Sequence, residues 1–64
     1  EERFSPREKE ILNKLIQGTT REEIAKELFI SKETVSTHRR NMLSKCDVKN
    51  TLELVNKSIK NGWV

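Results

Sequence analysis

The chain has 64 residues, enough for one small domain but not for an enclosed active-site cleft, so no enzymatic activity is expected. Charged residues make up 36% of the chain, and the longest apolar run, 28–30, is far below the roughly 18 residues of a membrane span. The single cysteine, Cys46, excludes an internal disulfide, and with only His38 it cannot complete a structural zinc site. A cytoplasmic protein without metal, cofactor or membrane segment is the expectation.

The net charge of +3 is unevenly distributed. Residues 1–31 carry six basic and seven acidic side chains, whereas residues 32–49 carry five basic and two acidic ones. A positive excess within one segment is typical of a module that binds a polyanion on one side. A solvated basic helix would show the same excess, so charge alone leaves both interpretations open.

Capping residues predict the first two helices. Ser5-Pro6-Arg7-Glu8 is a capping box with proline at the first helical position, and Gly18 ends the helix that it opens. Thr20-Arg21-Glu22-Glu23 is a second capping box. We therefore expect helices at about 6–17 and 21–28.

Two further helices are expected in the second half of the chain. Ser31 can cap a helix at about 32–46, with Val35, Met42 and Cys46 on its inward side. A third capping box, Asn50 to Glu53, opens a helix at about 51–61 that Asn61-Gly62 closes. No segment is left for a sheet, so the predicted fold is an all-α four-helix domain. In the last helix the spacing favours an inward stripe of Leu52, Val55 and Ile59.

The second and third helices are joined by only about three residues, Phe29-Ile30-Ser31. So short a link forces the two helices to cross steeply, which is the helix-turn-helix arrangement. A generic packed helical hairpin would share the same apolar positions. Glycine is common in such turns and Phe29 stands there instead, so the backbone of the turn cannot be inferred from the sequence.

The outward face of the third helix favours nucleic-acid binding. At 100° per residue, Ser36, Thr37 and Arg40 fall opposite the inward side. Small hydroxyl side chains let a helix approach the floor of a major groove, and an arginine there can donate two hydrogen bonds to a guanine edge. A helix that is merely solvated usually carries lysine and glutamate on this face.

From Phe4 to Val64 the chain resembles the LuxR-type (NarL/FixJ-like) DNA-binding domain of bacterial transcriptional regulators. The matching segments run in the same order over nearly the whole chain: Ser5 to Leu12, Gly18, Glu23 to Leu28, Ile30-Ser31, Thr34-Val35, Thr37-His38, Asn41-Met42, Lys45 and Val48. The resemblance implies four helices, with the third in the major groove. It implies base contacts from Ser36, Thr37 and Arg40, and phosphate contacts from Thr20, Ser31, Lys32, Thr34 and Lys49.

Some positions depart from the family pattern. Ser36 and Thr37 replace a common lysine and aliphatic residue, so the preferred DNA sequence cannot be transferred from a relative. Arg39 stands at a frequently aliphatic position, where it can reach a phosphate or pair with an acid of the second helix. Cys46 and His38 are interpreted as packing residues.

The fourth helix commonly serves dimer contacts in this family. Leu54 lies opposite the expected inward stripe, so it can either pack beside the first helix or form the centre of a dimer with Lys57, Ser58 and Asn61. Trp63 is expected to pack the last helix onto the first.

The function expected from these features is sequence-specific binding of double-stranded DNA by residues 1–64, the C-terminal part of a longer regulator. A homodimer through the fourth helix and RNA polymerase are its expected partners. Two alternatives stay open: a promoter-reading domain like that of a sigma factor, and a helical protein-interaction module that uses the fourth helix.

Overall fold

The computed structural model describes residues 4–63, and these residues form four helices and no strand. The helices are α1 (Pro6–Ile16), α2 (Arg21–Leu28), α3 (Lys32–Cys46) and α4 (Thr51–Lys60). The predicted all-α fold is confirmed, and the predicted helix ends differ from the observed ones by at most one residue. Residues 1–3 and 64 of the predicted domain lie outside the described part of the chain.

Side-chain caps start each helix where the sequence predicts. Ser5 Oγ accepts a hydrogen bond from the Glu8 N–H at 3.2 Å, and Glu8 Oε1 accepts one from the Ser5 N–H at 2.9 Å. Thr20 and Glu23 form the same reciprocal pair at the start of α2. Each capping box satisfies two backbone donors that would otherwise lack a partner, which makes these boundaries readable from sequence.

All four helices are followed within two residues by a residue with a left-handed backbone conformation, Gly62 in the case of α4. Gly18, just after the end of α1, has φ +86° and meets no steric penalty. Phe29 ends α2 at φ 58° and ψ 43°, and Asp47 ends α3 at φ 55° and ψ 47°. The turn between α2 and α3 therefore adopts the glycine-like conformation without a glycine, and the Phe29 ring is 94% exposed.

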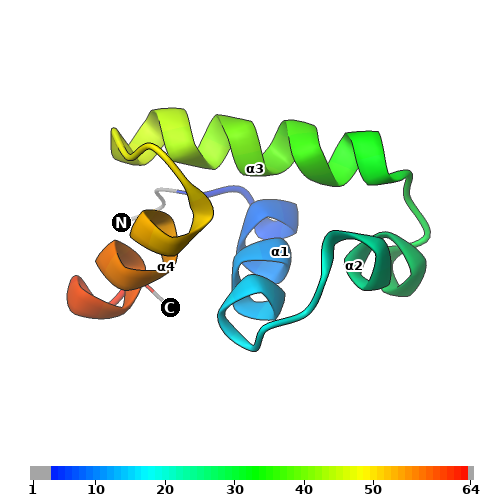
Figure 1. Ribbon diagram of the computed structural model, residues 1–64, viewed down its shortest axis with the longest axis horizontal. Helices are drawn as coiled ribbons and strands as arrows, with labels where there is room; N and C mark the ends of the chain where they lie inside the picture. Colours follow the sequence, from blue (N-terminus) through cyan, green and yellow to red (C-terminus); the bar gives the residue numbers. More distant parts are fainter. Residues whose placement is uncertain (1–3, 64) are drawn as a thin grey trace.

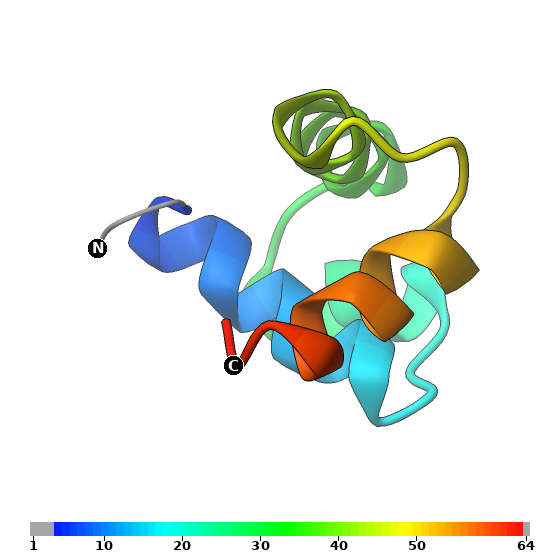
Figure 2. The ribbon, with the colours of Figure 1, turned by 90° about the vertical axis from the view of Figure 1, so that its left-hand side faces the viewer.

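The long helix α3 lies across the other three helices (Figure 1, Figure 2). Helix α2 packs near its N-terminal end, α1 near its middle and α4 near its C-terminal end. The core holds the apolar side chains that these helices turn inward: Phe4, Ile11, Leu12, Ile24, Ala25, Val35, Met42, Cys46 and Leu54. The predicted inward side of the third helix is thus confirmed.

The predicted orientation of α4 is wrong. Leu52 is 69% exposed and Ile59 is 56% exposed, whereas Leu54 and Ser58 are fully buried. At 100° per residue, the buried side centred on Leu54 and Ser58 lies roughly a third of a revolution from the expected one. Leu54 fills the core beside α1 and α3, so Leu54 and Ser58 are not surface residues and cannot form dimer contacts in this fold.

Polar bonds fix α4 to the end of α3. Lys57 Nζ donates to the carbonyl oxygen of Cys46 at 2.8 Å, where the helix leaves carbonyls without a partner. Arg39 Nη1 donates to Thr51 Oγ1 at 3.2 Å. Its guanidinium is thus directed to the first turn of α4 and not to an acid of α2.

A second polar cluster joins the start of α1 to the last turn of α3. Lys45 Nζ lies 2.6 Å from Glu8 Oε1, and the Glu8 residue is only 4% exposed. Burial by itself would raise the pKa of Glu8, but the hydrogen bonds from Lys45 and the Ser5 N–H, with the nearby charges of Lys45 and His38, outweigh it and lower this pKa. Glu8 therefore stays ionised at neutral pH as a bridge between the two helices.

The end of the described chain packs on its beginning. The rings of Phe4 and Trp63 meet edge-to-face with their centroids 6.0 Å apart. Trp63 thus anchors the segment after α4 next to the start of α1, close to the predicted contact with the first helix. No helix within residues 4–63 has both the length and the apolar character needed to cross a bilayer.

Candidate nucleic-acid interface

The outward face of α3 is open at its N-terminal half. Thr37 and Arg40 are exposed and Ser36 is half-buried. All three line one shallow hollow with Lys32, Glu33 and Arg21 of α2. The structure therefore brings the three predicted base-contacting residues together on one surface, with two further cations and one carboxylate around them.

Arg40 is the most available group on this face. Its guanidinium makes no hydrogen bond or ion pair with any residue between 4 and 63. All five of its N–H donors can therefore turn to a ligand, and a planar guanidinium matches the two acceptors on a guanine edge. Its neighbour Arg39 differs, because it is already bonded to Thr51.

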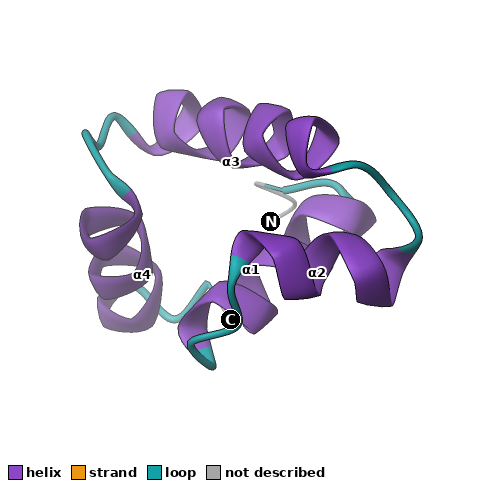
Figure 3. Ribbon diagram, turned by 45° about the vertical axis from the view of Figure 1, so that its right-hand side comes forward, coloured by secondary structure: helices purple, strands orange, loops and turns teal. Residues whose placement is uncertain are grey.

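The two hydroxyl residues beside Arg40 have different partners. Thr37 Oγ1 donates to the carbonyl oxygen of Glu33, one turn earlier, at 3.0 Å. Ser36 Oγ accepts a hydrogen bond from Arg21 Nη1 at 2.9 Å. Arg21 belongs to this face although sequence reasoning missed it. No periodicity links residues of two different helices. Only the crossing of α2 and α3 brings these two together; in Figure 1 α2 is seen nearly end-on and α3 lengthwise, and Figure 3 shows the short loop that joins them.

The predicted phosphate contacts around the helix starts act first as caps. Thr20 Oγ1 accepts from the Glu23 N–H at 3.1 Å, and Ser31 Oγ accepts from the Thr34 N–H at 3.0 Å. Thr34 Oγ1 lies 2.9 Å from Ser31 Oγ. The N–H of Thr34 is satisfied by this cap, whereas the N–H groups of Lys32 and Glu33, the first two residues of α3, have no bonded partner within residues 4–63 and stay open to an anion.

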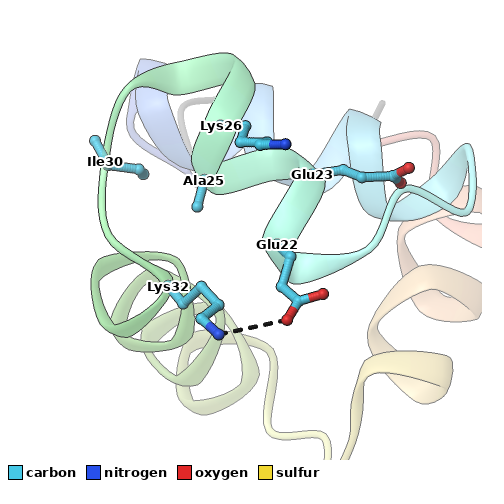
Figure 4. Close-up of a pocket in the computed structure, with 6 residues that line it drawn as sticks. All are labelled: Glu22, Glu23, Ala25, Lys26, Ile30 and Lys32. Atoms are coloured by element: carbon cyan, nitrogen blue, oxygen red, sulfur yellow. Dashed lines mark hydrogen bonds and ion pairs between the residues drawn. The ribbon is translucent and has the colours of Figure 1, made fainter.

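A second hollow lies beside the turn between α2 and α3, and Figure 4 shows its lining. Ala25 and Ile30 form its apolar part, and Glu22 and Lys32 face each other across it at 3.4 Å. Both partners of this ion pair are well exposed, so water screens it and Lys32 can exchange the carboxylate for a phosphate at low cost.

Lys49 lies away from these residues. It stands in the loop between α3 and α4, where its N–H donates to Glu53 Oε1 at 2.9 Å and its side chain is exposed. The predicted dimer residues are also separate from the hollow, on α4. Asn61 is exposed, whereas the half-buried Lys57 is engaged with Cys46.

Residues 4–63 contain no group of three or more His, Cys, Asp or Glu side chains placed to hold a metal ion. Cys46 is buried and forms no disulfide, and His38 is half-buried, in agreement with their interpretation as packing residues. The steeply crossed pair α2–α3, with an open basic face on its second helix, defines a helix-turn-helix DNA-binding domain.

Residues 2–58 match the family model described as "Bacterial regulatory proteins, luxR family". The chain belongs to this family, and its helix-turn-helix is that of a DNA-binding transcriptional regulator. Membership favours the LuxR-type prediction over the sigma-factor alternative, and the family is not enzymatic.

Several curated bacterial regulators are similar to the chain. An uncharacterized transcriptional regulatory protein of Bacillus subtilis, YxjL, is 40% identical over 63 residues, which is 98% of this chain and 29% of that protein. The CsgBAC operon transcriptional regulatory protein of Escherichia coli is 55% identical over 49 residues, 77% of this chain and 23% of that protein. The transcriptional regulatory protein UhpA of Salmonella typhimurium is 42% identical over 60 residues, 94% of this chain and 30% of that protein. The chain spans less than a third of each of these relatives.

Proposed function

We propose that the chain recognises a specific sequence of double-stranded DNA by placing α3 in the major groove. Ser36, Thr37 and Arg40 contact base edges in this proposal. The single observation that carries it is the Arg40 guanidinium, exposed and without a bonded partner in residues 4–63, at the centre of a face of small hydroxyl side chains. An arginine that only served stability would be expected to bond within the fold, as Arg39 does.

Phosphate contacts fix the position of the domain on the duplex. We assign them to the start of α3, through Ser31, Lys32 and Thr34, with Thr20 before α2 and Lys49 in the loop before α4. The open N–H groups at the start of α3 and the exposed ammonium groups support this assignment, because oriented amides and cations both favour phosphate oxygens. Such contacts fix orientation without selecting a sequence.

Two copies are proposed to pair through α4. The buried positions of Leu54 and Ser58 remove them from this surface, so we assign the contact to the stripe of the exposed Leu52 and Ile59 and the half-buried Val55, with Asn61 at its end. Apolar side chains at this spacing form one continuous strip along a helix. Pairing sets the spacing of two half-sites on the duplex.

The relatives are more than three times as long as the matched segment, and this supports the proposal that the domain is one part of a longer regulator. We infer a location in the bacterial cytoplasm, because the proposed DNA partner lies there. RNA polymerase is the partner through which a bound regulator would act on transcription.

The test is a binding selection from random duplexes with the wild-type chain, Arg40→Gln and Arg39→Gln. We expect Arg40→Gln to lose a guanine preference at one position, worth about 1–3 kcal/mol. Arg39→Gln removes the same charge from the adjacent residue and should keep the preference. A uniform loss of affinity in Arg40→Gln, with the salt slope reduced by about 1, would assign Arg40 to a phosphate instead.

A further inference from the structure

A hydrogen bond between α2 and α3 determines the direction in which the Ser36 hydroxyl proton points. Arg21, the first residue of α2, donates from Nη1 to Ser36 Oγ at 2.9 Å. A guanidinium has donors and no acceptor, so the hydroxyl oxygen must be the acceptor in this bond. The bond occupies one lone pair of Ser36 and leaves its proton directed away from Arg21.

The adjacent hydroxyl has the opposite polarity. Thr37 Oγ1 gives its proton to the Glu33 carbonyl, so Thr37 presents only lone pairs and a methyl group to the outside. The Ser36 side chain makes no hydrogen bond with residues 4–63 other than the one from Arg21. Two neighbouring hydroxyl groups on one face therefore offer different chemistry: Ser36 offers its proton and one remaining lone pair, whereas Thr37 offers lone pairs alone.

We propose that Arg21 is a positioning residue for sequence specificity: by bonding to Ser36 Oγ it makes this hydroxyl a donor to the base that it meets. The inference rests on the proposed function, because it requires α3 to lie in the major groove. Purine N7, guanine O6 and thymine O4 are the acceptors in that groove, whereas cytosine presents only its N4–H₂ donor. Ser36 therefore discriminates against cytosine on the strand that it contacts.

The location of Arg21 suits this role. It lies on α2, which packs on α3, and it lines the same hollow as Ser36, Thr37 and Arg40. Only one of its five N–H groups is used by Ser36. The competing role is a plain phosphate contact, in which Arg21 would add affinity on every sequence equally.

The test compares the wild-type chain with Arg21→Ala, Ser36→Ala and the double variant in a selection from random duplexes. We expect both single variants to lose about three- to tenfold discrimination against cytosine, the range of one hydrogen bond, at the same base-pair position. The double variant should lose no more than either one, because both substitutions remove the same interaction.

Two further variants separate positioning from charge. Arg21→Lys keeps the charge, but the lysine nitrogen stands one atom nearer the backbone than Arg21 Nη1 and falls short of Ser36 Oγ. It should therefore bind non-specific duplex like the wild type and still lose the discrimination. Lys26→Ala is the matched control. Lys26 is an exposed cation of α2 that lines the hollow beside the α2–α3 turn and not the hollow that contains Ser36. It should leave the preference unchanged. Thermal unfolding of each variant checks that the fold is intact.

The outcomes distinguish this inference from the proposed function. If Arg21→Ala weakens binding to all sequences by one factor, or alters a position other than that of Ser36, Arg21 is a phosphate contact and the inference is overturned. If Arg40→Gln loses its guanine preference while Arg21→Ala changes nothing, only this inference fails. A wild-type chain that binds all duplexes alike would overturn both.

Discussion

Phe29 holds a backbone conformation that suits glycine, at the turn between α2 and α3. An L-residue with a side chain loses about 1–2 kcal/mol in the left-handed region. The ring is 94% exposed and gains little from burial in return. We expect Phe29→Gly to raise the free energy of unfolding by about 1 kcal/mol, after the flexibility of glycine is subtracted. A midpoint about 4–8 °C higher in thermal unfolding would show this gain.

Phe29→Ala is the matched control, because it removes the ring and keeps the Cβ that causes the strain. Its midpoint should stay near that of the wild type. A lower midpoint in both variants would mean that the ring stabilises the domain through a contact that its exposure does not indicate.

Ser58 is buried in α4, and its hydroxyl has no hydrogen-bond partner within the described chain. A buried hydroxyl that has lost water without gaining a partner costs about 1–3 kcal/mol. We therefore expect Ser58→Ala to stabilise the domain by about 1 kcal/mol or more, measured by chemical unfolding.

Alanine also has a higher helix propensity than serine, so the contribution of helix propensity to the unfolding free energy needs its own control. Ser44→Ala, at an exposed position of α3, measures the helix-propensity share alone. The gain at Ser58 should exceed the gain at Ser44. A loss of stability in Ser58→Ala would instead indicate a buried water bonded to the hydroxyl.

Helix α4 shows how an element can be located correctly and oriented wrongly. Its start and end follow from Asn50 and from Asn61-Gly62, whose chemistry is local. Its inward face depends on which apolar stripe the rest of the molecule covers, and that is not local. A surface helix usually buries its fuller apolar stripe, but in α4 two members of that stripe, Leu52 and Ile59, are exposed.

Leucines two positions apart on α4 should therefore respond differently. Leu54→Ala empties a fully buried site and should cost about 2–5 kcal/mol of unfolding free energy. Leu52→Glu changes a side chain that is 69% exposed and should stay within about 0.5 kcal/mol. Thermal unfolding gives both values, and sedimentation of the same samples reports self-association.

In the proposed pairing, Leu52→Glu should weaken self-association and binding to a duplex with two half-sites, while leaving binding to one half-site unchanged. Equal loss of stability in the two variants would contradict the orientation of α4 described above. Unchanged self-association in a folded Leu52→Glu chain would remove the stripe as the pairing surface.

At the scale of the whole molecule, the bridge between Glu8 and Lys45 makes stability depend on pH. The pKa of Glu8 is lower in the folded chain than its usual value of 4.5, so the unfolded chain binds more protons between the two values. The stabilisation is therefore complete above about pH 4.5 and is lost as the pH falls through the folded pKa. Unfolding midpoints measured between neutral and acidic pH should fall over this window.

Glu8→Gln should have a lower midpoint at neutral pH and a smaller decrease on acidification. Glu10→Gln is the control, since Glu10 forms only an exposed pair with Arg7 at 3.3 Å. If Glu8→Gln keeps the acid dependence of the wild type, another carboxylate is responsible for it.

Helix boundaries and the inward face of α3 could be predicted from the sequence, because they depend on local capping residues and on the helical repeat. Capping residues gave the helix ends, and the 100° repeat placed Val35 inside and Arg40 outside. Side-chain contacts between helices, such as Arg21 with Ser36 or Arg39 with Thr51, could not be predicted from the sequence. These depend on the crossing angles of packed helices, which no single helix encodes.

The bond from Arg39 to Thr51 ties the middle of α3 to the first turn of the helix whose apolar stripe faces outward. This bond fixes the orientation of α4 relative to α3. In two chains paired along that stripe, the distance and angle between the two α3 helices would therefore be fixed as well. One base pair added between half-sites turns one of them by about 34° and shifts it by about 3.4 Å. A dimer with fixed geometry cannot follow both changes. The affinity of the paired domains for DNA would therefore depend on the number of base pairs between the half-sites as much as on the half-site sequence.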